Sequence, residues 1–557
     1  GLSNHDVTVI TRRMGGGFGG KESQGNLPAI VAALAAKLTG RPAELIYDRD
    51  DDFILTGKRH DFQISYKVGF EDNGLINSVI VDQAMRCGMS WDLSEAIAAR
   101  AMCHAENSYF MKNMRITSHR LKTNTQSNTA FRGFGGPQGI VGMERIIDHV
   151  AHHLNIDPLL VRERNFYPHK TSATHGITPY GQIVHDCIIQ DIIAELKKTS
   201  NYVDRRKDIE RFNKNSEFLK RGISLTPVKF GISFNASFLN QAGALLHVYN
   251  DGSVYLNHGG TEMGQGLHTK VLGIISNELG VSFNKIKISE TDTSKIANTS
   301  ATAASSGSDL NGMAAFKAAR KIKERITKFI SKKYKISIKS IRFKDNFIFT
   351  SDKKYRFDQI IKEAYLERIQ LWDSGFYKTP KIHWDRKKAK GKPFYYYSYG
   401  AAVSEVTIDI LTGEYKVNRV DILHDVGKSL NKTIDIGQIE GGFIQGMGWL
   451  TCEELFWDQD GSLKTHAPST YKIPLASDRP DIFNIQIASW SKNSEKTIKR
   501  SKAVGEPPFM LAISVHEALQ MAVASIADYK VKPKMNAPAT PEEVLSSIYD
   551  IKKEYQF

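Results

Sequence analysis

The sequence has few cysteines, and no two of them lie close together in the chain. Its 557 residues include four, which lie far apart along the chain: Cys87, Cys103, Cys187 and Cys452. Zinc sites and iron–sulfur clusters need cysteines at short, repeated spacings. We therefore expect no cysteine-bound metal in this chain.

Long apolar runs are missing as well. A membrane-spanning helix needs about 20 apolar residues, and no uninterrupted apolar run approaches that length. The N-terminus has no basic segment followed by an apolar stretch, as a secretion signal would. We expect a cytoplasmic protein with no membrane partner. Because Gly1 is followed almost at once by a strand-like segment, we also expect the chain to be the downstream piece of something longer.

Two further catalytic patterns are absent. The sequence contains no G-x-S-x-G nucleophile elbow. His149, His152 and His153 share one helix-like segment, but they do not form the H-E-x-x-H arrangement of zinc proteases. These absences argue against a covalent hydrolase and a zinc enzyme.

The chain is basic, with a formal net charge of +15. Residues 320–335 and 386–392 are the best support for a nucleic-acid partner. Their lysines, however, alternate with Ile, Asn and Ser as on ordinary solvated surfaces. We expect no nucleic-acid partner, although an acidic protein surface stays open as an alternative.

Strand and helix signals alternate along the chain, which predicts a mixed α/β (α+β) fold with two or more cores. The expected strands are 7–14, 43–48, 62–70 and 75–84, with hairpins at 246–256 and 406–423. The expected helices are 28–38, 139–154, 264–279, 311–332, 437–449 and 508–527. The charged segment 202–221 is the best candidate for a connection, which gives a first domain over 1–200 and a second over 201–557.

A glycine-rich segment near the N-terminus nearly satisfies two phosphate-binding patterns. Residues 15–21 read G-x-x-x-x-G-K, as in a P-loop, but the next position must be Ser or Thr and is Glu22. Residues 15–20 also read G-x-G-x-x-G, but the acidic partner, Asp48, lies too far along the chain. We expect this loop to approach a polar, anionic ligand with its backbone, and to place a carboxylate where nucleotide loops have none.

Three more loops rich in small residues precede helices, at 132–138, 260–266 and 298–307. Helix N-termini with open backbone N–H groups favour anionic oxygen atoms. Each loop alone is explained as a tight turn. Four of them, distributed over two domains, suggest one extended ligand held from several sides.

Glu506 lies between small residues and two prolines, just before an apolar segment. The local sequence favours a cap for the following helix. The same rigid, apolar setting also suits a general base. Both interpretations stay open on the local sequence.

Seven motifs carry a family resemblance: RRMGGGFGGKE, NTAFRGFGGPQG, LNQAGALLHVY, GGTEMGQGLHTK, NTSATAASSGSDLNG, STYKIP and SKAVGEPP. With these motifs, in this order, the chain resembles the molybdenum-binding part of the xanthine dehydrogenase branch of the molybdenum hydroxylases, over essentially its whole length. The resemblance implies two elongated α/β domains with a molybdopterin cofactor at their interface. That arrangement agrees with one ligand held by four loops.

The resemblance also implies roles for single residues. Glu506 matches the general base that takes the proton of a molybdenum-bound hydroxyl. Glu22 and Arg100 match two polar residues that orient a purine, and Phe134 and Phe234 match the aromatic pair that sandwiches its ring. The positions around the cofactor are Phe18, Gly19, Arg132, Gly264, Gln265, Ala303, Ala304 and Ser305. Those implied to surround the molybdenum are Phe18, Arg132 and Ala304.

The chain departs from the family pattern in two places. Asn235, also expected to contact substrate, stands where the family has Thr, which leaves substrate preference open. A preceding segment of the same domain, with a Gln near the molybdenum, is not in this sequence. We expect either a longer chain or another polypeptide to supply it.

For the whole enzyme the resemblance implies hydroxylation of hypoxanthine to xanthine and of xanthine to urate. The molybdenum would carry a sulfido ligand, and electrons would pass through two [2Fe–2S] clusters and FAD to NAD. The clusters and FAD would lie on other domains or subunits, in a dimer of complete assemblies. An aldehyde oxidase is the alternative, but the polar pair Glu22 and Arg100 favours a purine over a simple aldehyde.

Overall fold

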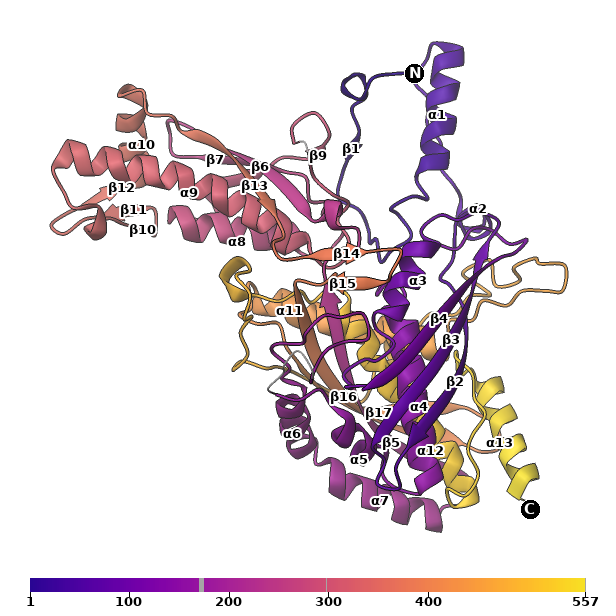
Figure 1. Ribbon diagram of the computed structural model, residues 1–557. Coiled ribbons are helices and arrows are strands. Elements are labelled where there is room, and N and C mark those ends of the chain that lie inside the picture. Colours follow the sequence, from indigo (N-terminus) through magenta and orange to yellow (C-terminus); the bar gives the residue numbers. More distant parts are fainter. Residues whose placement is uncertain (170–174, 297, 556–557) are drawn as a thin grey trace.

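The computed structural model describes residues 1–169, 175–296 and 298–555 (Figure 1). Helices and strands alternate along most of the chain, which confirms the expected mixed α/β class. A body built around one central sheet carries a lobe that projects from it (Figure 1).

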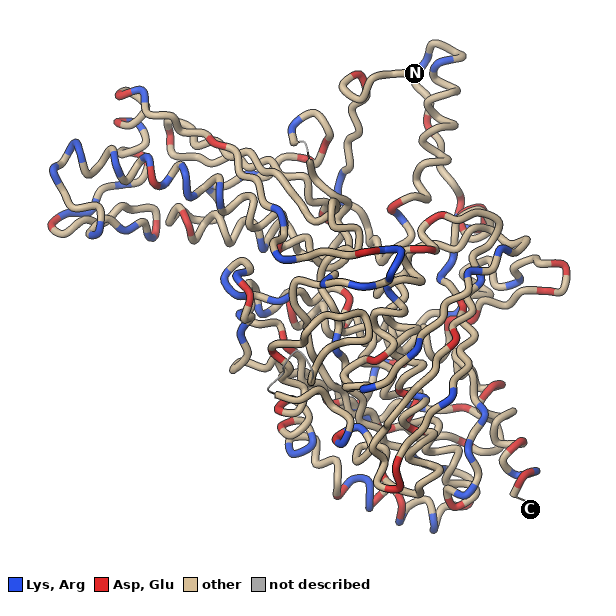
Figure 2. Tube along the Cα trace, viewed as in Figure 1, with Lys and Arg blue, Asp and Glu red and all other residues tan. Residues whose placement is uncertain are grey.

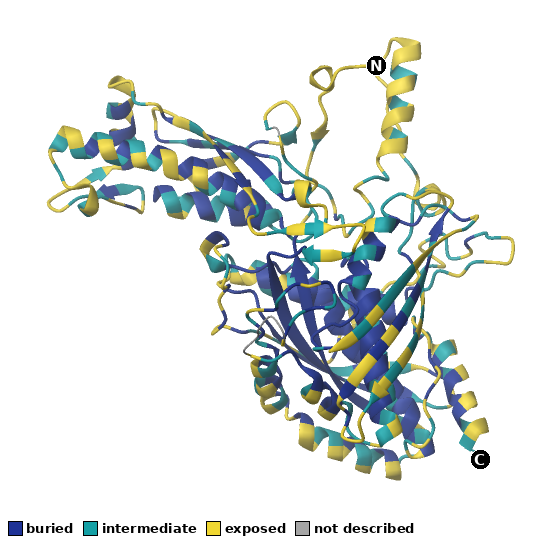
Figure 3. Ribbon diagram, viewed as in Figure 1, coloured by how far each residue is buried: buried dark blue, intermediate teal, exposed yellow. Residues whose placement is uncertain are grey.

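The central sheet has the order β18-β17-β16-β5. Its strands are β5 (Leu219–Ile232), β16 (Tyr396–Asp409), β17 (Tyr415–His424) and β18 (Ile482–Ile487). All neighbours are antiparallel except β17 and β18, which run parallel. Most residues of β5 and β16 are buried, because this sheet is covered on both faces (Figure 3).

Two hydrophobic clusters cover the two faces of the central sheet. On one face the helices are α11 (Lys432–Thr451), the 3₁₀ helix η7 (Pro507–Ala512), α12 (Ile513–Ala524) and α13 (Pro541–Tyr555). On the other they are α4 (Gly136–Leu154), α5 (Pro158–Asn165), α6 (Ile189–Thr199) and α7 (Tyr202–Asn215). A second sheet packs on α4 with the order β2 (Phe62–Phe70), β3 (Ile76–Gly88), β4 (Asn113–Lys122), next to α3 (Ser94–Met102). The hydrophobic cluster on the α4–α7 side contains residues from both sides of position 200. The expected division of the chain into two domains at position 200 stays a prediction.

The projecting lobe has its own hydrophobic cluster. Its sheet has the order β13 (Trp372–Lys378), β6 (Gln241–Val248), β7 (Val254–His258), β8 (Ile286–Ile288). The long helix α9 (Gly307–Tyr334) packs on this sheet beside α8 (Leu267–Leu279). The lobe ends in a small sheet and a helix: β10 (Arg342–Lys344), β11 (Phe347–Phe349), β12 (Lys354–Arg356) and α10 (Phe357–Leu366).

Shorter elements complete the chain. The remaining strands are β1 (Ile10–Thr11), β9 (Thr291–Asp292), β14 (His383–Asp385) and β15 (Lys390–Lys392), and the remaining α-helices are α1 (Asn26–Thr39) and α2 (Arg49–Leu55). The other 3₁₀ helices are Asn4–Asp6, Ser237–Leu239, Phe283–Lys285, Ile338–Ser340, Ala476–Asp478, Ile498–Arg500 and Ser525–Ala527. Helix α1 stands away from the body with no buried residue (Figures 1 and 3).

Most of the expected long elements are present, including both hairpins, but two of the expected strands need correction. The expected strand 7–14 reduces to Ile10–Thr11, because only these residues find a partner strand, β9. The expected strand 43–48 is an irregular segment. The expected connection 202–221 is helix α7 followed by the start of β5. Some of its charged residues form ion pairs with the central sheet: Arg205 pairs with Glu405 of β16 at 2.8 Å and with Asp421 of β17 at 3.0 Å.

One described helix, 507–527, is long and apolar enough to cross a membrane by length and composition alone. Within its most apolar 18-residue stretch, 89% of the residues are buried in the protein. Its α12 segment contacts β5 and β16 of the central sheet. A core helix passes the same test, and its packing identifies it as one.

Candidate active site

The four loops rich in small residues meet one another and the loop that carries Glu506. The five segments are 14–22, 130–136, 260–266, 299–306 and 501–506, and each pair of neighbours is joined by at least one contact described below. Four of them lead into η7 or one of the helices α4, α8 and α9, so helix N-termini converge on this region. Segments almost 500 residues apart in sequence therefore surround one place.

The 14–22 loop joins the 130–136 loop. Gly19 and Phe131 form an isolated antiparallel bridge. Gly19 has φ +113°, and an added Cβ would lie 2.6 Å from the carbonyl oxygen of Ala130, so only glycine allows this approach. The guanidinium of Arg132 lies over the Phe18 ring, 6.0 Å from its centre.

The 260–266 loop joins two of the others. The backbone N–H of Met14 donates to the carbonyl of Glu262 over 3.0 Å. The backbone N–H of Thr261 donates to the hydroxyl of Thr302 over 2.8 Å. Gln265 holds its own loop, since its amide donates to the carbonyl of Thr261 over 2.9 Å.

The carboxylate of Glu506 is fixed by two other loops. One oxygen accepts a hydrogen bond from the backbone N–H of Gly133 (3.2 Å), and the other accepts from the hydroxyl of Ser305 (2.8 Å). The backbone N–H of Glu506 donates back to the same hydroxyl over 2.8 Å. Glu506 occupies the N-cap position of η7, but its side chain makes no capping hydrogen bond there. The side chain is therefore turned toward the other loops and not toward its own helix.

Arg132 is buried and connects its own loop to the Glu506 loop and to α11. Its guanidinium donates to the carbonyl of Gly505 (2.7 Å), to the side chain of Gln445 (3.1 Å) and to the carbonyl of Gln438 (3.3 Å). Burial lowers the pKa of Arg132 to about 10, while the charge of Glu506 acts in the opposite direction. The guanidinium keeps its charge at neutral pH and ties the Glu506 loop to α11.

Several of the expected site residues have strained backbones. Phe18 (φ 51°), Phe134 (φ 52°), Ala304 (φ 52°) and Ser305 (φ 55°) are all left-handed, although none is glycine. Such residues cost about 1–3 kcal/mol each and gather at functional sites. Ala303 comes just before this pair and accepts a hydrogen bond from the Ser306 hydroxyl at 3.1 Å.

Glu22 and Arg100 lie within electrostatic reach of Glu506. Although the Glu22 side chain is accessible to solvent, desolvation by the surrounding protein raises its pKa to about 7, with a further rise from repulsion by Glu506. The buried Arg100 has its pKa lowered by desolvation, and the negative charge of Glu506 opposes that shift. The carboxyl groups of Glu22 and Glu506 and the guanidinium of Arg100 thus share one electrostatic environment.

The Arg100 guanidinium is largely engaged by the protein. It donates to the carbonyls of Ser233 (2.8 Å) and Gly231 (2.6 Å) and lies 4.7 Å from the centre of the Phe230 ring. Among the described residues, its Nε has no hydrogen-bond partner. Arg100 can therefore offer charge to a ligand, but few free donors.

The three remaining expected substrate contacts lie on two elements. Phe134 follows Arg132 and packs beside Ile97 of α3, while Phe234 and Asn235 follow β5. Within the part of the chain that the structure describes, Phe134 and Phe234 make no ring contact with each other, and neither polar atom of the Asn235 amide has a hydrogen-bond partner. The amide also lies close enough to the Cys103 thiol to act on the pKa of that thiol, whose overall rise comes from burial.

The loops fit an anionic, hydrogen-bonding cofactor. Added Cβ atoms at Gly15, Gly20 and Gly264 would meet nothing within 4 Å, so there is space beside the backbone at these glycines. The N–H of Gly264 donates to the carboxylate of Glu262 over 2.9 Å, and the same carboxylate accepts from the N–H groups of Gly266 and His268 at the start of α8. The N-termini of α4 and α9, which follow two of the other loops, are the kind of environment that anionic oxygen atoms prefer. If such a group binds here, the residues expected from the sequence to contact it include Gly264 and Gln265 on the 260–266 loop and Ala304 and Ser305 on the 299–306 loop.

Sequence reasoning missed the residues that support this site. Gln438 and Gln445 on α11 hold Arg132. Lys502 is buried and donates to the carboxylate of Asp425 over 2.7 Å, which anchors the start of the Glu506 loop. The Asp425 carboxylate and the α11 glutamines lie far from the loops in sequence, and no local pattern marks them.

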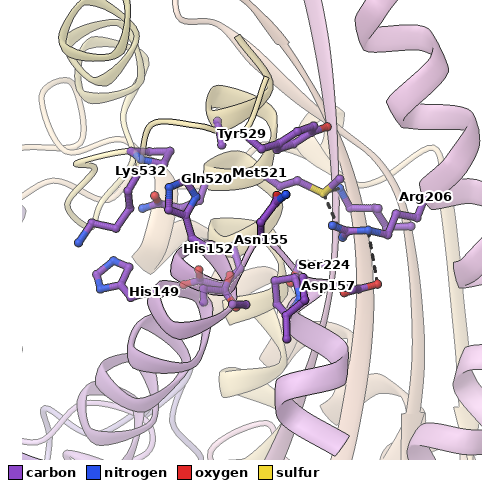
Figure 4. Close-up of a pocket in the computed structure, with 18 of the residues that line it drawn as sticks. His149, His152, Asn155, Asp157, Arg206, Ser224, Gln520, Met521, Tyr529 and Lys532 are labelled. Carbon is purple, nitrogen blue, oxygen red and sulfur yellow. Dashed lines mark hydrogen bonds and ion pairs between the residues drawn. The ribbon is translucent and has the colours of Figure 1, made fainter. Parts of the chain in front are cut away.

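A separate pocket of about 310 Å³ lies between α4, α7 and α12 (Figure 4). None of the expected site residues lines it. His149 lies at one end, where it hydrogen-bonds to Tyr66 and Arg145, and burial together with the Arg145 charge lowers its pKa to about 3. No group of three or more metal-ligating side chains occurs among the described residues.

Comparison with known proteins gives two family matches. Two protein-family models, both described as a molybdopterin cofactor-binding domain, match residues 1–166 and 195–480. The chain is 44% identical over 553 residues to xanthine dehydrogenase/oxidase of Gallus gallus, which covers 99% of this chain and 39% of that protein. It is 42% identical over 561 residues to xanthine dehydrogenase of Oryza sativa subsp. japonica, with 99% and 39% covered. The chain thus spans about two fifths of the length of these relatives.

Solved structures share the fold. A reconstituted CO dehydrogenase from Oligotropha carboxidovorans has a TM-score of 0.87 at 21% identity, over 99% of this chain and 69% of that one. An aldehyde oxidoreductase from Desulfovibrio gigas has a TM-score of 0.81 at 23% identity, over 99% and 56%. At these identities the likeness concerns the fold alone.

Proposed function

Because this chain belongs to the family of molybdopterin cofactor-binding domains, we propose that it forms the molybdenum site of an enzyme that hydroxylates purines oxidatively. The proposed reactions are hypoxanthine to xanthine and xanthine to urate, in line with the names of the relatives. The observation that carries the proposal is the carboxylate of Glu506, held by two donors where the five loops meet.

Glu506 is placed to act as a general base. Its two oxygens each accept one hydrogen bond from the protein, which leaves lone pairs to take a proton from an attacking hydroxyl. Because Ser305 contacts both the backbone and the side chain of Glu506, the carboxylate keeps its direction. The molybdenum cofactor, when bound, would supply the oxidation chemistry.

Glu22 and Arg100 support a purine as the substrate. With a pKa raised to about 7, Glu22 is present as both acid and carboxylate at neutral pH, so it can donate to a ring nitrogen or accept from an N–H group. The buried charge of Arg100 favours negative charge that develops on the ring. A simple aldehyde would leave these polar groups without partners.

The alternative is an aldehyde-oxidising enzyme of the same family. One observation favours it: Arg100 already donates to two backbone carbonyls, which leaves it little to offer a heterocycle. The ratio of kcat/KM for xanthine and for an aromatic aldehyde separates the two. If the wild-type enzyme prefers the aldehyde, and Glu22→Gln keeps the same preference, the purine assignment is overturned.

We propose that [2Fe–2S] clusters, FAD and the NAD site lie on further domains or subunits, with complete assemblies forming dimers. The support is the greater length of the relatives, of which this chain spans about 39%. Electron transfer to NAD is therefore to be measured on the complete assembly.

The main test is Glu506→Gln in that assembly. General base catalysis contributes about 10²–10⁴-fold, so we expect the reductive half-reaction with xanthine to slow by that factor at unchanged molybdenum content. Glu495→Gln removes an acid that pairs with Lys381 and has no described contact with the five loops; it is the matched control and should stay near wild type. A loss of only a few-fold in Glu506→Gln would remove the base assignment.

A further inference from the structure

Positive charge is concentrated at the free end of the projecting lobe. Residues 328–356 contain ten lysines and arginines and two aspartates, which gives +8 in a chain with a net charge of +15 (Figure 2). This segment forms the end of α9 and the small sheet β10-β11-β12. About half of the excess charge of the protein therefore lies in 29 residues.

The small sheet is two-sided. Phe343, Ile348 and Tyr355 are opposite one another in register and face the lobe core. Side chains alternate along a strand, so the other positions of all three strands share the opposite side. We call this side the outer face; its residues are Arg342, Lys344, Phe347, Phe349, Lys354 and Arg356.

The strand register arranges the outer face in two rows. One row is Arg342, Phe349 and Lys354, and the other is Lys344, Phe347 and Arg356. In each row a phenylalanine of the central strand lies between two cations on the flanking strands. The four cationic side chains are exposed, and the two phenylalanines are half-buried with ring centres 6.4 Å apart.

The first row keeps its charge free of acidic neighbours. Among the described residues no ion pair involves Arg342 or Lys354, whereas Lys344 lies 3.6 Å from Asp345 and Arg356 donates to Asp358 over 3.0 Å. Lys354 instead lies over the Phe347 ring, 4.9 Å from its centre. The outer face therefore combines accessible cations with π-surfaces.

We infer that the outer face of the β10-β11-β12 sheet binds single-stranded nucleic acid, with bases against Phe347 and Phe349 and phosphates against the flanking cations. Single strands are held by basic surfaces with interleaved aromatic rings, because every base has a π-face and every nucleotide a phosphate. A patch that only attracts polyanions would need no aromatic residue between its cations. This surface is independent of the redox function proposed above.

The test uses the full chain with whatever partner subunits it carries, and a labelled single-stranded RNA of about 12 nucleotides, a length within the usual site sizes. Four cationic side chains predict a slope of log K against log salt of about −3. Phe347→Leu with Phe349→Leu removes the rings but keeps an apolar surface, and we expect binding to weaken about tenfold or more. Arg342→Gln with Lys354→Gln should weaken it as well and flatten the salt slope.

Lys552→Gln with Lys553→Gln, on α13, removes the same charge from another surface and is the matched control. It should bind RNA within about twofold of wild type, as expected for loss of two distant charges. A sulfated polysaccharide and anionic phosphatidylserine vesicles are the competing probes. Three results would each overturn the inference: no RNA binding by wild type, unchanged binding by the double leucine variant, or binding to vesicles without binding to RNA.

Discussion

The raised pKa of Glu22 makes a specific prediction about pH and stability. The carboxyl has an ordinary pKa of 4.5, and in the folded protein desolvation, followed by repulsion from Glu506, raises it to about 7. The folded protein therefore holds this proton more tightly than the unfolded chain. Between about pH 4.5 and 7 the unfolded chain loses the proton first, so stability falls as the pH rises. Below this window Glu22 contributes no penalty.

The size of the effect follows from the same shift. A rise from 4.5 to about 7 corresponds to at most roughly 3.4 kcal/mol, at about 1.4 kcal/mol for each tenfold change in proton affinity. Because the side chain is accessible to solvent, screening reduces this penalty, and we expect about 1 kcal/mol. Glu22→Gln removes the charge and should therefore be more stable than wild type at pH 8, and equal to it near pH 4.5.

The assay is thermal unfolding of both proteins across pH 4.5–8. For a chain of 557 residues about 1 kcal/mol is a difference in Tm of about 1–2 °C, so the pH trend of the difference is the measurement. Glu217→Gln, a solvent-exposed acid elsewhere on the chain, is the control and should show no such trend. Combining Glu22→Gln with Glu506→Gln should give less than the sum of the two single effects, since the repulsion can be removed only once. A constant difference between Glu22→Gln and wild type at every pH would refute this reasoning.

Two further predictions concern the scaffold of the site. Gly19→Ala places a Cβ 2.6 Å from the Ala130 carbonyl at φ +113°, so we expect a loss of about 1–3 kcal/mol in stability and a lower molybdenum content, whereas Gly20→Ala, where the space is open, should resemble wild type. Lys502→Met leaves the buried carboxylate of Asp425 without its ammonium, and chemical unfolding should show a loss of about 3–5 kcal/mol; a loss below about 1 kcal/mol would mean that the pair does not anchor the Glu506 loop.

The repeating elements of the fold could be predicted because their signals are local. Helix α4 and the strands β2 and β3 follow from the spacing of apolar residues, and the hairpin between β16 and β17 follows from its turn. The prediction of a strand over residues 7–14 was wrong for the opposite reason. Its residues are strand-like, but a strand persists only where another strand lies beside it, and β9 pairs with just two residues.

The site shows the same division. The glycine-rich loops were visible in the sequence, because close backbone approaches require glycine. Their order around the site was not, since the partners of Glu506 are Gly133 and Ser305, hundreds of residues away. The local sequence favoured a helix cap for Glu506, and only the arrangement of the loops in space shows the carboxylate turned away from its helix.

The sequence by itself determined the class of fold, the loops of the site and the family resemblance, because each depends on residues that are neighbours in the chain. The tertiary structure decided what those loops contact, which charges share one environment, and that cations and phenylalanines alternate across the outer face of a small sheet. The sequence shows only that cations and phenylalanines are both present in residues 342–356; strand register, which no local pattern encodes, places them beside one another.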